Sequence, residues 1–182
     1  MRLHHRLFTF ALLALILLPG SAGAQELYTY SVGVLGGLGG SLDVDRGDSL
    51  DNTGFQLNLD MVTDPRTHVG IRLGRLGLDS DEFFGSLRDA ELSYVTVGGE
   101  YRFRQVYYDS GLYLGLGGYR LEGTGAENRD AKNTSIGLAV GITGEFTINR
   151  RMGVLVEISG HWVDFDEAQI FAMAHGGLAF HF

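Results

Sequence analysis

Three residues near the C-terminal end of the chain carry side chains of the kind used in nucleophilic catalysis. Glu157, Ser159 and His161 alternate along the chain, so an extended strand would place a carboxylate, a hydroxyl and an imidazole on one face. Elsewhere the sequence contains no Gly-x-Ser-x-Gly elbow, Gly-x-Gly-x-x-Gly loop, Walker loop or His-Glu-x-x-His motif. The case for an enzyme therefore depends on this one alternating group.

An acidic run at residues 43–51 superficially suggests a calcium-binding loop. It offers Asp43, Asp45, Asp48 and Asp51, but the sixth position of the pattern is not Gly and the twelfth is not Glu. We interpret it as a solvated acidic loop, and we expect neither a metal site nor a cofactor in this protein.

Composition narrows the class of protein further. The chain has 182 residues, about one domain's worth, with 28 Gly, only 2 Pro, and 45% apolar residues. It has no Cys, which excludes disulfides and thiol chemistry. The formal net charge of −8 argues against a nucleic-acid partner.

The first 24 residues have the pattern of a secretory signal peptide. Basic residues at the start precede the apolar run 8–18, Pro19 and Gly20 end that run, and Ala22-Gly23-Ala24 forms a small-x-small cleavage site. The apolar run is too short to cross a bilayer as a helix, which needs about 20 residues. We therefore predict a cleaved signal peptide at 1–24 and a single folded domain at 25–182.

Beyond residue 25 the chain alternates apolar and polar residues with a period of two, which is the period of a β-strand. Polar breaks separate the alternating stretches. Eight such stretches can be recognised, at residues 28–38, 55–61, 69–73, 95–103, 111–119, 135–146, 154–162 and 169–182. Only the third stretch loses its phase, after Leu73, which would put Arg75 on the apolar face unless a bulge intervenes.

The connections between these stretches alternate in length. The odd-numbered links are 40–51, 79–89, 122–133 and 164–168, and the even-numbered links, 63–68, 104–108 and 147–152, are shorter on average. The odd-numbered links also hold most of the 22 acidic residues and only four of the basic ones. Long links at one end and short turns at the other are typical of outer-membrane barrels, with the long side facing outward. We therefore expect an acidic crown on the cell surface.

Aromatic residues gather where four stretches would meet the inner membrane interface, if both termini are periplasmic. Aromatic girdles form at such interfaces because the rings are partly apolar and partly polar. A soluble barrel of the lipocalin type is the alternative, but it would point its apolar face inward and has no need of such a ring. The predicted girdle consists of Tyr28, Tyr30, Tyr101, Phe103, Phe146, Phe180 and Phe182.

A signal peptide, eight alternating segments and the ending Leu178-Ala179-Phe180-His181-Phe182 resemble the small outer-membrane β-barrels of the OmpA/OmpX type. The resemblance implies an all-β fold, an eight-stranded antiparallel up-and-down transmembrane β-barrel in the bacterial outer membrane. It also implies that Phe180 and Phe182 act as the signal for the barrel-assembly machinery. Unlike OmpA, this chain is expected to have no domain after the barrel, so we expect no peptidoglycan-binding role to carry over.

The polar face of these strands should fill the barrel, because eight strands enclose a space that side chains occupy and no open pore remains. Unpaired charges are costly there, so Arg72 and Arg102 should each bridge acids. We predict a structural plug, with a gated proton or ion path as the alternative. The predicted interior network consists of Asp60, Arg72, Glu100, Arg102, Glu145, Glu157 and His161.

These patterns favour a non-enzymatic membrane anchor with acidic surface loops that serve envelope integrity or surface interaction. The expected partners are outer-membrane lipids, lipopolysaccharide and the assembly machinery, with an unidentified extracellular partner and a monomeric state. One alternative is transport of a small or apolar solute, as in OmpW or porins. The other is a lipid A deacylase, although these enzymes use His-x-Ser and this chain has the reverse order in Ser159-Gly160-His161.

Overall fold

The structure, a computed structural model, describes residues 29–42, 50–78, 88–104, 108–124, 130–165 and 168–182. Strands account for nearly all of these residues, and no helix among them is long and apolar enough to cross a membrane. The predicted signal peptide and Tyr28 lie outside the described residues. The strands are β1 (Tyr30–Ser41), β2 (Asn52–Asp64), β3 (Thr67–Leu78), β4 (Arg88–Arg104), β5 (Tyr108–Thr124), β6 (Asp130–Asn149), β7 (Met152–Asp164) and β8 (Ala168–His181).

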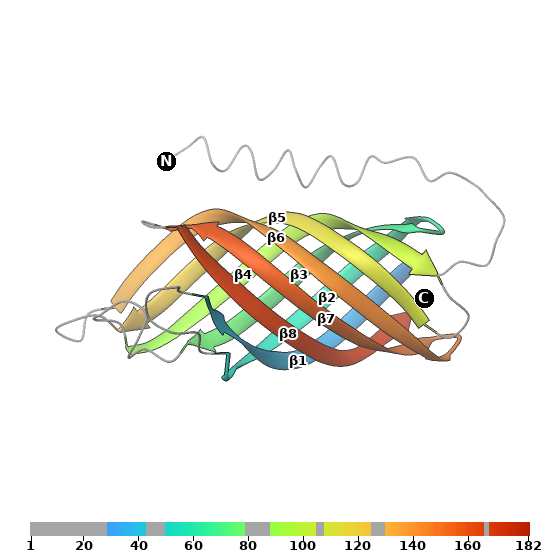
Figure 1. Cartoon of the computed structure of the whole chain (residues 1–182), viewed down its shortest axis with the longest axis horizontal. Helices are drawn as coiled ribbons and strands as arrows, with labels where there is room; N and C mark the ends of the chain where they lie inside the picture. The colour runs from blue at the N-terminus through green and yellow to red at the C-terminus, as the bar shows by residue number, and fades with distance from the viewer. Residues whose placement is uncertain (1–28, 43–49, 79–87, 105–107, 125–129, 166–167) are drawn as a thin grey trace.

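The eight strands form one closed antiparallel barrel. Each strand pairs with its neighbour in the sequence, and β8 returns to pair with β1, so no sheet edge is left open. Figure 1 shows this closure, with β1 in blue beside β8 in red. The predicted fold class, an all-β up-and-down barrel of eight antiparallel strands, is confirmed.

Tight turns connect the strands at one end of the barrel. Residues 65–66 join β2 to β3, and residues 150–151 join β6 to β7. The Arg66 backbone N–H donates to Asp64 Oδ1 over 2.9 Å, and this bond holds the pKa of the Asp64 carboxyl below its usual range. At the same end, the Thr29 N–H donates to the Phe182 carbonyl over 2.9 Å. The first and last described residues therefore lie at the turn end, as predicted.

The hairpin of β5 and β6 is longer than the sequence indicated. Residues 122–133 were expected to form a loop, but the ladder continues through Glu122 opposite Lys132 to Thr124 opposite Asp130. Opposite charges directly across an antiparallel pair favour the extended ladder, and Lys132 Nζ lies 3.9 Å from Glu122 Oε1. This prediction of the loop boundary was wrong, because a polar strand that extends beyond the apolar band has no hydrophobic alternation to reveal it.

The barrel is inside-out compared with a soluble β-protein. On β5, Leu112, Leu114 and Leu116 are 52%, 58% and 68% exposed on the outer wall, whereas Tyr113 between them is 4% exposed. The same pattern follows the other strands, with large apolar side chains outside and polar ones buried. Apolar side chains would not be left on an exterior surrounded by water in such numbers. The outer wall is suited to contact lipid.

Strand β3 keeps its phase through its last residues. Arg75 points outward, as the alternation requires without a bulge, and its Nε donates to Glu91 Oε1 over 2.7 Å. Leu76 and Leu78 consequently point into the barrel. The polar face of the strands was predicted to fill the barrel, yet the loop-side part of the interior is apolar. This core consists of Leu76, Leu78, Ala90, Leu92, Tyr94, Tyr119, Leu121, Val163, Phe165, Phe171 and Met173.

Glycines allow the first and last strands to approach closely where the barrel closes. A Cβ on Gly177 would meet the Val34 carbonyl oxygen and would lie 2.7 Å from Leu35 Cα, and a Cβ on Gly37 would lie 2.7 Å from His175 Cα. These neighbours are backbone atoms, which cannot move aside as the end of a flexible side chain can. By contrast, a Cβ on Gly118 would meet nothing within 4 Å.

We predict that Gly177→Ala will destabilise the folded barrel by about 1–3 kcal/mol, because the added methyl group pushes β1 away from β8. The matched control Gly118→Ala should change stability by less than about 0.5 kcal/mol. Urea unfolding in detergent micelles, followed by the gel mobility of unboiled samples, measures both. Equal stability of the two variants would show that the closure does not need glycine at 177.

Candidate functional site: a buried ion-pair network

Arg72 lies at the centre of the polar part of the interior. It comes from the middle of β3, where the alternation turns its side chain inward, and it is only 2% exposed. Its guanidinium pairs with Asp60 on β2, with Glu100 on β4 at 2.9 Å and with Glu157 on β7 at 3.3 Å. The guanidinium carbon also lies 4.6 Å from the centre of the Tyr113 ring. One side chain thus connects strands on opposite sides of the barrel.

Arg102 forms a second centre nearer the turn end. Its Nε donates to Glu100 Oε1 over 2.7 Å, and its Nη1 donates to Glu145 Oε2 over 2.6 Å. His181 Nε2 lies 2.6 Å from the other oxygen of Glu145, and the Thr143 hydroxyl donates to Glu100 over 2.9 Å. Glu100 therefore bridges the two arginines, and the charged groups form one continuous chain of contacts.

Neutral side chains donate further hydrogen bonds to Glu157. Gln56 donates to Glu157 Oε1 over 2.9 Å and Asn58 donates to Glu157 Oε2 over 3.3 Å, while the Tyr94 hydroxyl donates to Gln56 over 2.5 Å. Gln56 and Asn58 lie on the polar face of the alternating stretch 55–61, but the predicted network did not include them. Tyr94 gave no signal, because it precedes the recognised stretch of β4 and a tyrosine is usual on either face.

His161 lies apart from the ion pairs. Its Nδ1 is 2.8 Å from the Tyr119 hydroxyl, its Nε2 is 3.1 Å from Ser159 Oγ, and its ring packs against Tyr94 with a centroid separation of 4.9 Å. The structure thus brings together six of the seven predicted network residues. His161 lies on the loop side of them, next to the apolar core. Since Glu157 binds Arg72, Gln56 and Asn58, it does not orient the His161 imidazole as a catalytic carboxylate would.

Several inward glycines provide the space for the carboxylates. A Cβ on Gly153 would lie 2.6 Å from Glu145 Oε1, and one on Gly111 would lie 2.6 Å from Glu100 Oε1. A Cβ on Gly70 would meet Asp60. At these three positions the neighbour that needs the space is a charged group of the network.

Two further histidines are buried without hydrogen bonds. Within the described ranges, neither ring nitrogen of His68 or His175 has a partner. The same part of the chain contains no group of three or more His, Cys, Asp or Glu residues arranged to hold a metal ion. In the described interior the charged groups are therefore paired with one another, and they are not arranged as a metal ligand set.

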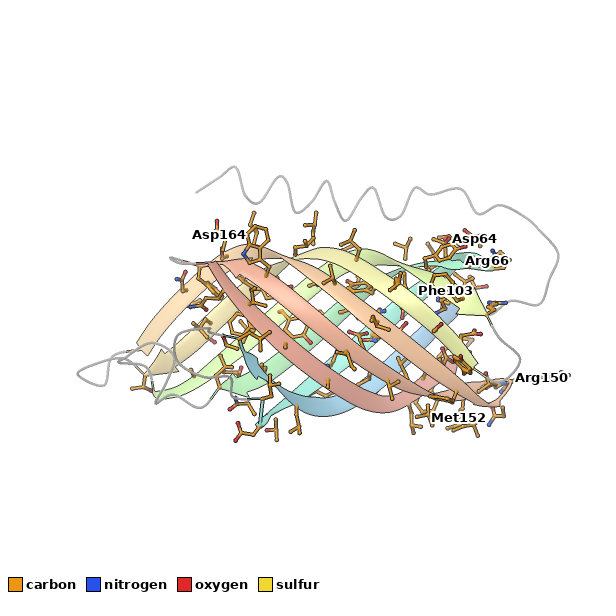
Figure 2. All side chains as sticks on the ribbon, in the orientation of Figure 1. Asp64, Arg66, Phe103, Arg150, Met152 and Asp164 are labelled. Atoms are coloured by element: carbon orange, nitrogen blue, oxygen red, sulfur yellow. The ribbon has the colours of Figure 1, made fainter. Side chains whose placement is uncertain are left out.

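Aromatic side chains surround the turn end of the barrel. Tyr101 and Phe103 meet edge to face at 5.1 Å, and Phe146 packs against Tyr108 at 5.9 Å. Phe103 lies at this end beside Asp64 and Arg66 (Figure 2). The predicted girdle residues within the described ranges lie on this level, and Tyr108 was missed. The exposed members are Tyr30, Tyr101, Phe103, Tyr108, Phe146 and Phe182, with Phe180 partly covered.

Residues at the other end of the outer wall were also missed. Trp162 on β7 is 56% exposed and Phe55 on β2 is 49% exposed. Both lie toward the loop end of their strands, so aromatic rings occur near both ends of the apolar band, as interfacial aromatic belts do. The alternation places both rings on the apolar face of their strands. It does not show that they lie at a common level, because each is a single ring on a separate strand.

The last residue of the described chain is held in the sheet. The Phe182 N–H donates to the Tyr30 carbonyl over 2.9 Å, and the Phe182 carbonyl accepts from Thr29. Phe180 lies opposite Met152 on β7 and opposite Val32 on β1. The role of Phe180 and Phe182 as an assembly signal remains a prediction.

Solved structures with this fold are bacterial outer-membrane barrels. Neisserial surface protein A is 13% identical, with a TM-score of 0.70 over 88% of this chain and 100% of that one. The N-terminal barrel of Pseudomonas aeruginosa OprF is 10% identical, with a TM-score of 0.59 over 84% and 97%. Ail of Yersinia pestis is 16% identical, with a TM-score of 0.55 over 84% and 96%. No protein-family model and no curated protein sequence matches this chain.

The chain therefore has the fold of the small eight-stranded outer-membrane β-barrels. At sequence identities of 10%, 13% and 16%, the similarity to these structures shows the fold alone.

We predict that Arg72→Met will destabilise the barrel by about 3–5 kcal/mol, because Asp60, Glu100 and Glu157 are left buried without their shared cation. The control Arg75→Met breaks the exposed pair with Glu91 and should cost less than about 1 kcal/mol. Both values come from equilibrium unfolding in urea. If the two variants unfold at the same denaturant concentration, the interior ion pairs do not hold the barrel together.

Proposed function

We propose that this protein is a non-enzymatic component of the bacterial outer membrane, a closed barrel that anchors acidic surface loops. The observation that supports the proposal is the filled interior. Ion pairs around Arg72 and Arg102 occupy the turn-side part, and the apolar core with Phe171 and Met173 occupies the loop-side part. A chain of buried charges followed by packed apolar side chains offers no continuous path for water or a solute.

The proposal includes the processing and placement of the chain. Residues 1–24 act as a signal peptide, cleaved after Ala24, and 25–182 insert into the outer membrane through the assembly machinery, which reads Phe180 and Phe182. The turn end then faces the periplasm and the long links face the exterior, among lipopolysaccharide molecules.

The barrel acts as a monomer, and the acidic links contact an extracellular partner or support envelope integrity. The names of two proteins with this fold, a surface protein and an attachment invasion locus protein, accord with a role at the cell surface.

Catalysis by the alternating group on β7 is not supported by its surroundings. Ser159 and His161 are 4% and 2% exposed and point into the closed interior. A nucleophile must reach its substrate, and a lipid ester moves outside this wall. The carboxylate that would complete a catalytic group is held by the network.

The orientation can be tested with single cysteines, since the chain contains none. Asp64 and Asp164 lie at opposite ends of the barrel (Figure 2). In intact cells, a maleimide on a polymer too large for porins should label Asp164→Cys. It should label Asp64→Cys only after the outer membrane is permeabilised, because the turn end faces the periplasm. The reverse labelling, or labelling of both sites in intact cells, would contradict the proposed placement.

The closed interior predicts electrical silence. Purified protein inserted into a planar bilayer at neutral pH should give no discrete conductance steps, because the interior has no water-filled path. A large porin inserted under the same conditions serves as the positive control, and protease protection in liposomes shows that the barrel has inserted. Reproducible steps would favour the transport alternative over the anchor.

A further inference from the structure

A hollow lies on the outer surface of the barrel, at the turn end. It has a volume of about 630 Å³ and is formed where β8 ends beside the turn between β6 and β7. Arg150 and Met152, which belong to it, lie at the same end as Asp64, Arg66 and Phe103 (Figure 2). The lining residues are Arg150, Arg151, Met152, Phe180, His181 and Phe182.

Backbone contacts hold the parts of this hollow together. The Asn149 side chain accepts from the Arg151 N–H over 2.8 Å, and the Arg151 carbonyl accepts from the His181 N–H over 2.9 Å. Met152 lies directly opposite Phe180 in the ladder. The backbone of the turn is therefore held against the end of β8, so that Arg150 and Arg151 lie beside an apolar surface at the level of the aromatic girdle.

The arginines of this turn are exposed and form no ion pair within the described ranges. The nearby carboxylate of Glu145 points inward and is already bound by Arg102 and His181. Both arginines line the hollow, and a guanidinium group that forms no ion pair can bind a phosphate group through paired hydrogen bonds. The acids of the chain are concentrated at the opposite end, so this end is the one suited to an anion.

We propose that the hollow binds the headgroup of an anionic phospholipid in the periplasmic leaflet. Arg150 and Arg151 hold the lipid phosphate, while Met152, Phe180 and Phe182 cover the upper part of an acyl chain. A free phosphate would leave this apolar surface in contact with water, whereas a phospholipid covers it and neutralises the arginines together. This inference rests on the proposed membrane placement and assigns a lipid partner to the turn end.

The test measures lipid binding to the purified full-length protein by native mass spectrometry in a mild detergent. The probes are phosphatidylglycerol and phosphatidylcholine with identical acyl chains, and inorganic phosphate alone. The double variant Arg150→Gln/Arg151→Gln removes both charges of the hollow. The matched control Arg66→Gln/Arg104→Gln removes two exposed charges from the same end but outside the hollow.

We expect the protein to bind phosphatidylglycerol more tightly than phosphatidylcholine and to show no binding of inorganic phosphate at the same concentration. The hollow variant should bind phosphatidylglycerol about thirtyfold more weakly, which corresponds to the loss of two charges worth roughly 1 kcal/mol each. The control variant should bind within about twofold of the unmodified protein, a difference that corresponds to a small fraction of that free energy. Equal losses in the two variants, or no preference for the anionic lipid, would overturn the proposal.

Heat-modifiable gel migration accompanies each measurement and shows that every variant is folded. If the unmodified protein inserts into liposomes but shows no lipid preference, the lipid site is wrong and the anchor remains. If the protein does not insert into bilayers at all, both proposals are wrong.

Discussion

Four carboxylates share the interior of a narrow barrel with two guanidinium groups, and burial makes any of these charges costly unless it is paired. Arg72 reaches Glu100 and Glu157 on strands that lie far apart in sequence, and Arg102 joins the chain of contacts through Glu100. Because these groups are buried, with Arg72 and Glu157 each 2% exposed, each charge depends on its protein partners for stabilisation. The ion pairs consequently tie the strands together across the barrel, in addition to the hydrogen bonds around its wall.

The inward glycines fall into two groups, according to whether a charged side chain or a neighbouring backbone occupies the space beside them. Gly111 and Gly153 leave room for carboxylates of the network, whereas Gly37 and Gly177 allow the backbones of β1 and β8 to approach each other. The first group belongs to the electrostatics of the interior and the second to the closure of the sheet. Both follow from the small circumference of an eight-stranded barrel, in which the wall curves sharply and little volume remains inside.

The two ends of the barrel differ in chemistry, and the proposed functions follow from that difference. In the proposed function, each end acts on its own side of the membrane. The long acidic links suit contacts with the exterior, and the turn end presents Arg150 and Arg151 beside an aromatic surface suited to phospholipid.

The sequence by itself determined the number of strands, the outward direction of residues such as Leu114, the inward direction of Arg72 and the turn-end level of the aromatic rings. These are local properties, since a period of two and the position of a turn are visible in a few consecutive residues. Only the tertiary structure decided that Arg72 meets Glu157, 85 residues away, that Leu76 and Phe171 share an apolar core, and that Met152 lies beside Phe180. Such contacts depend on the stagger between strands when the sheet closes, and on which side chains then face each other across the axis, and no local pattern of alternation encodes either of these.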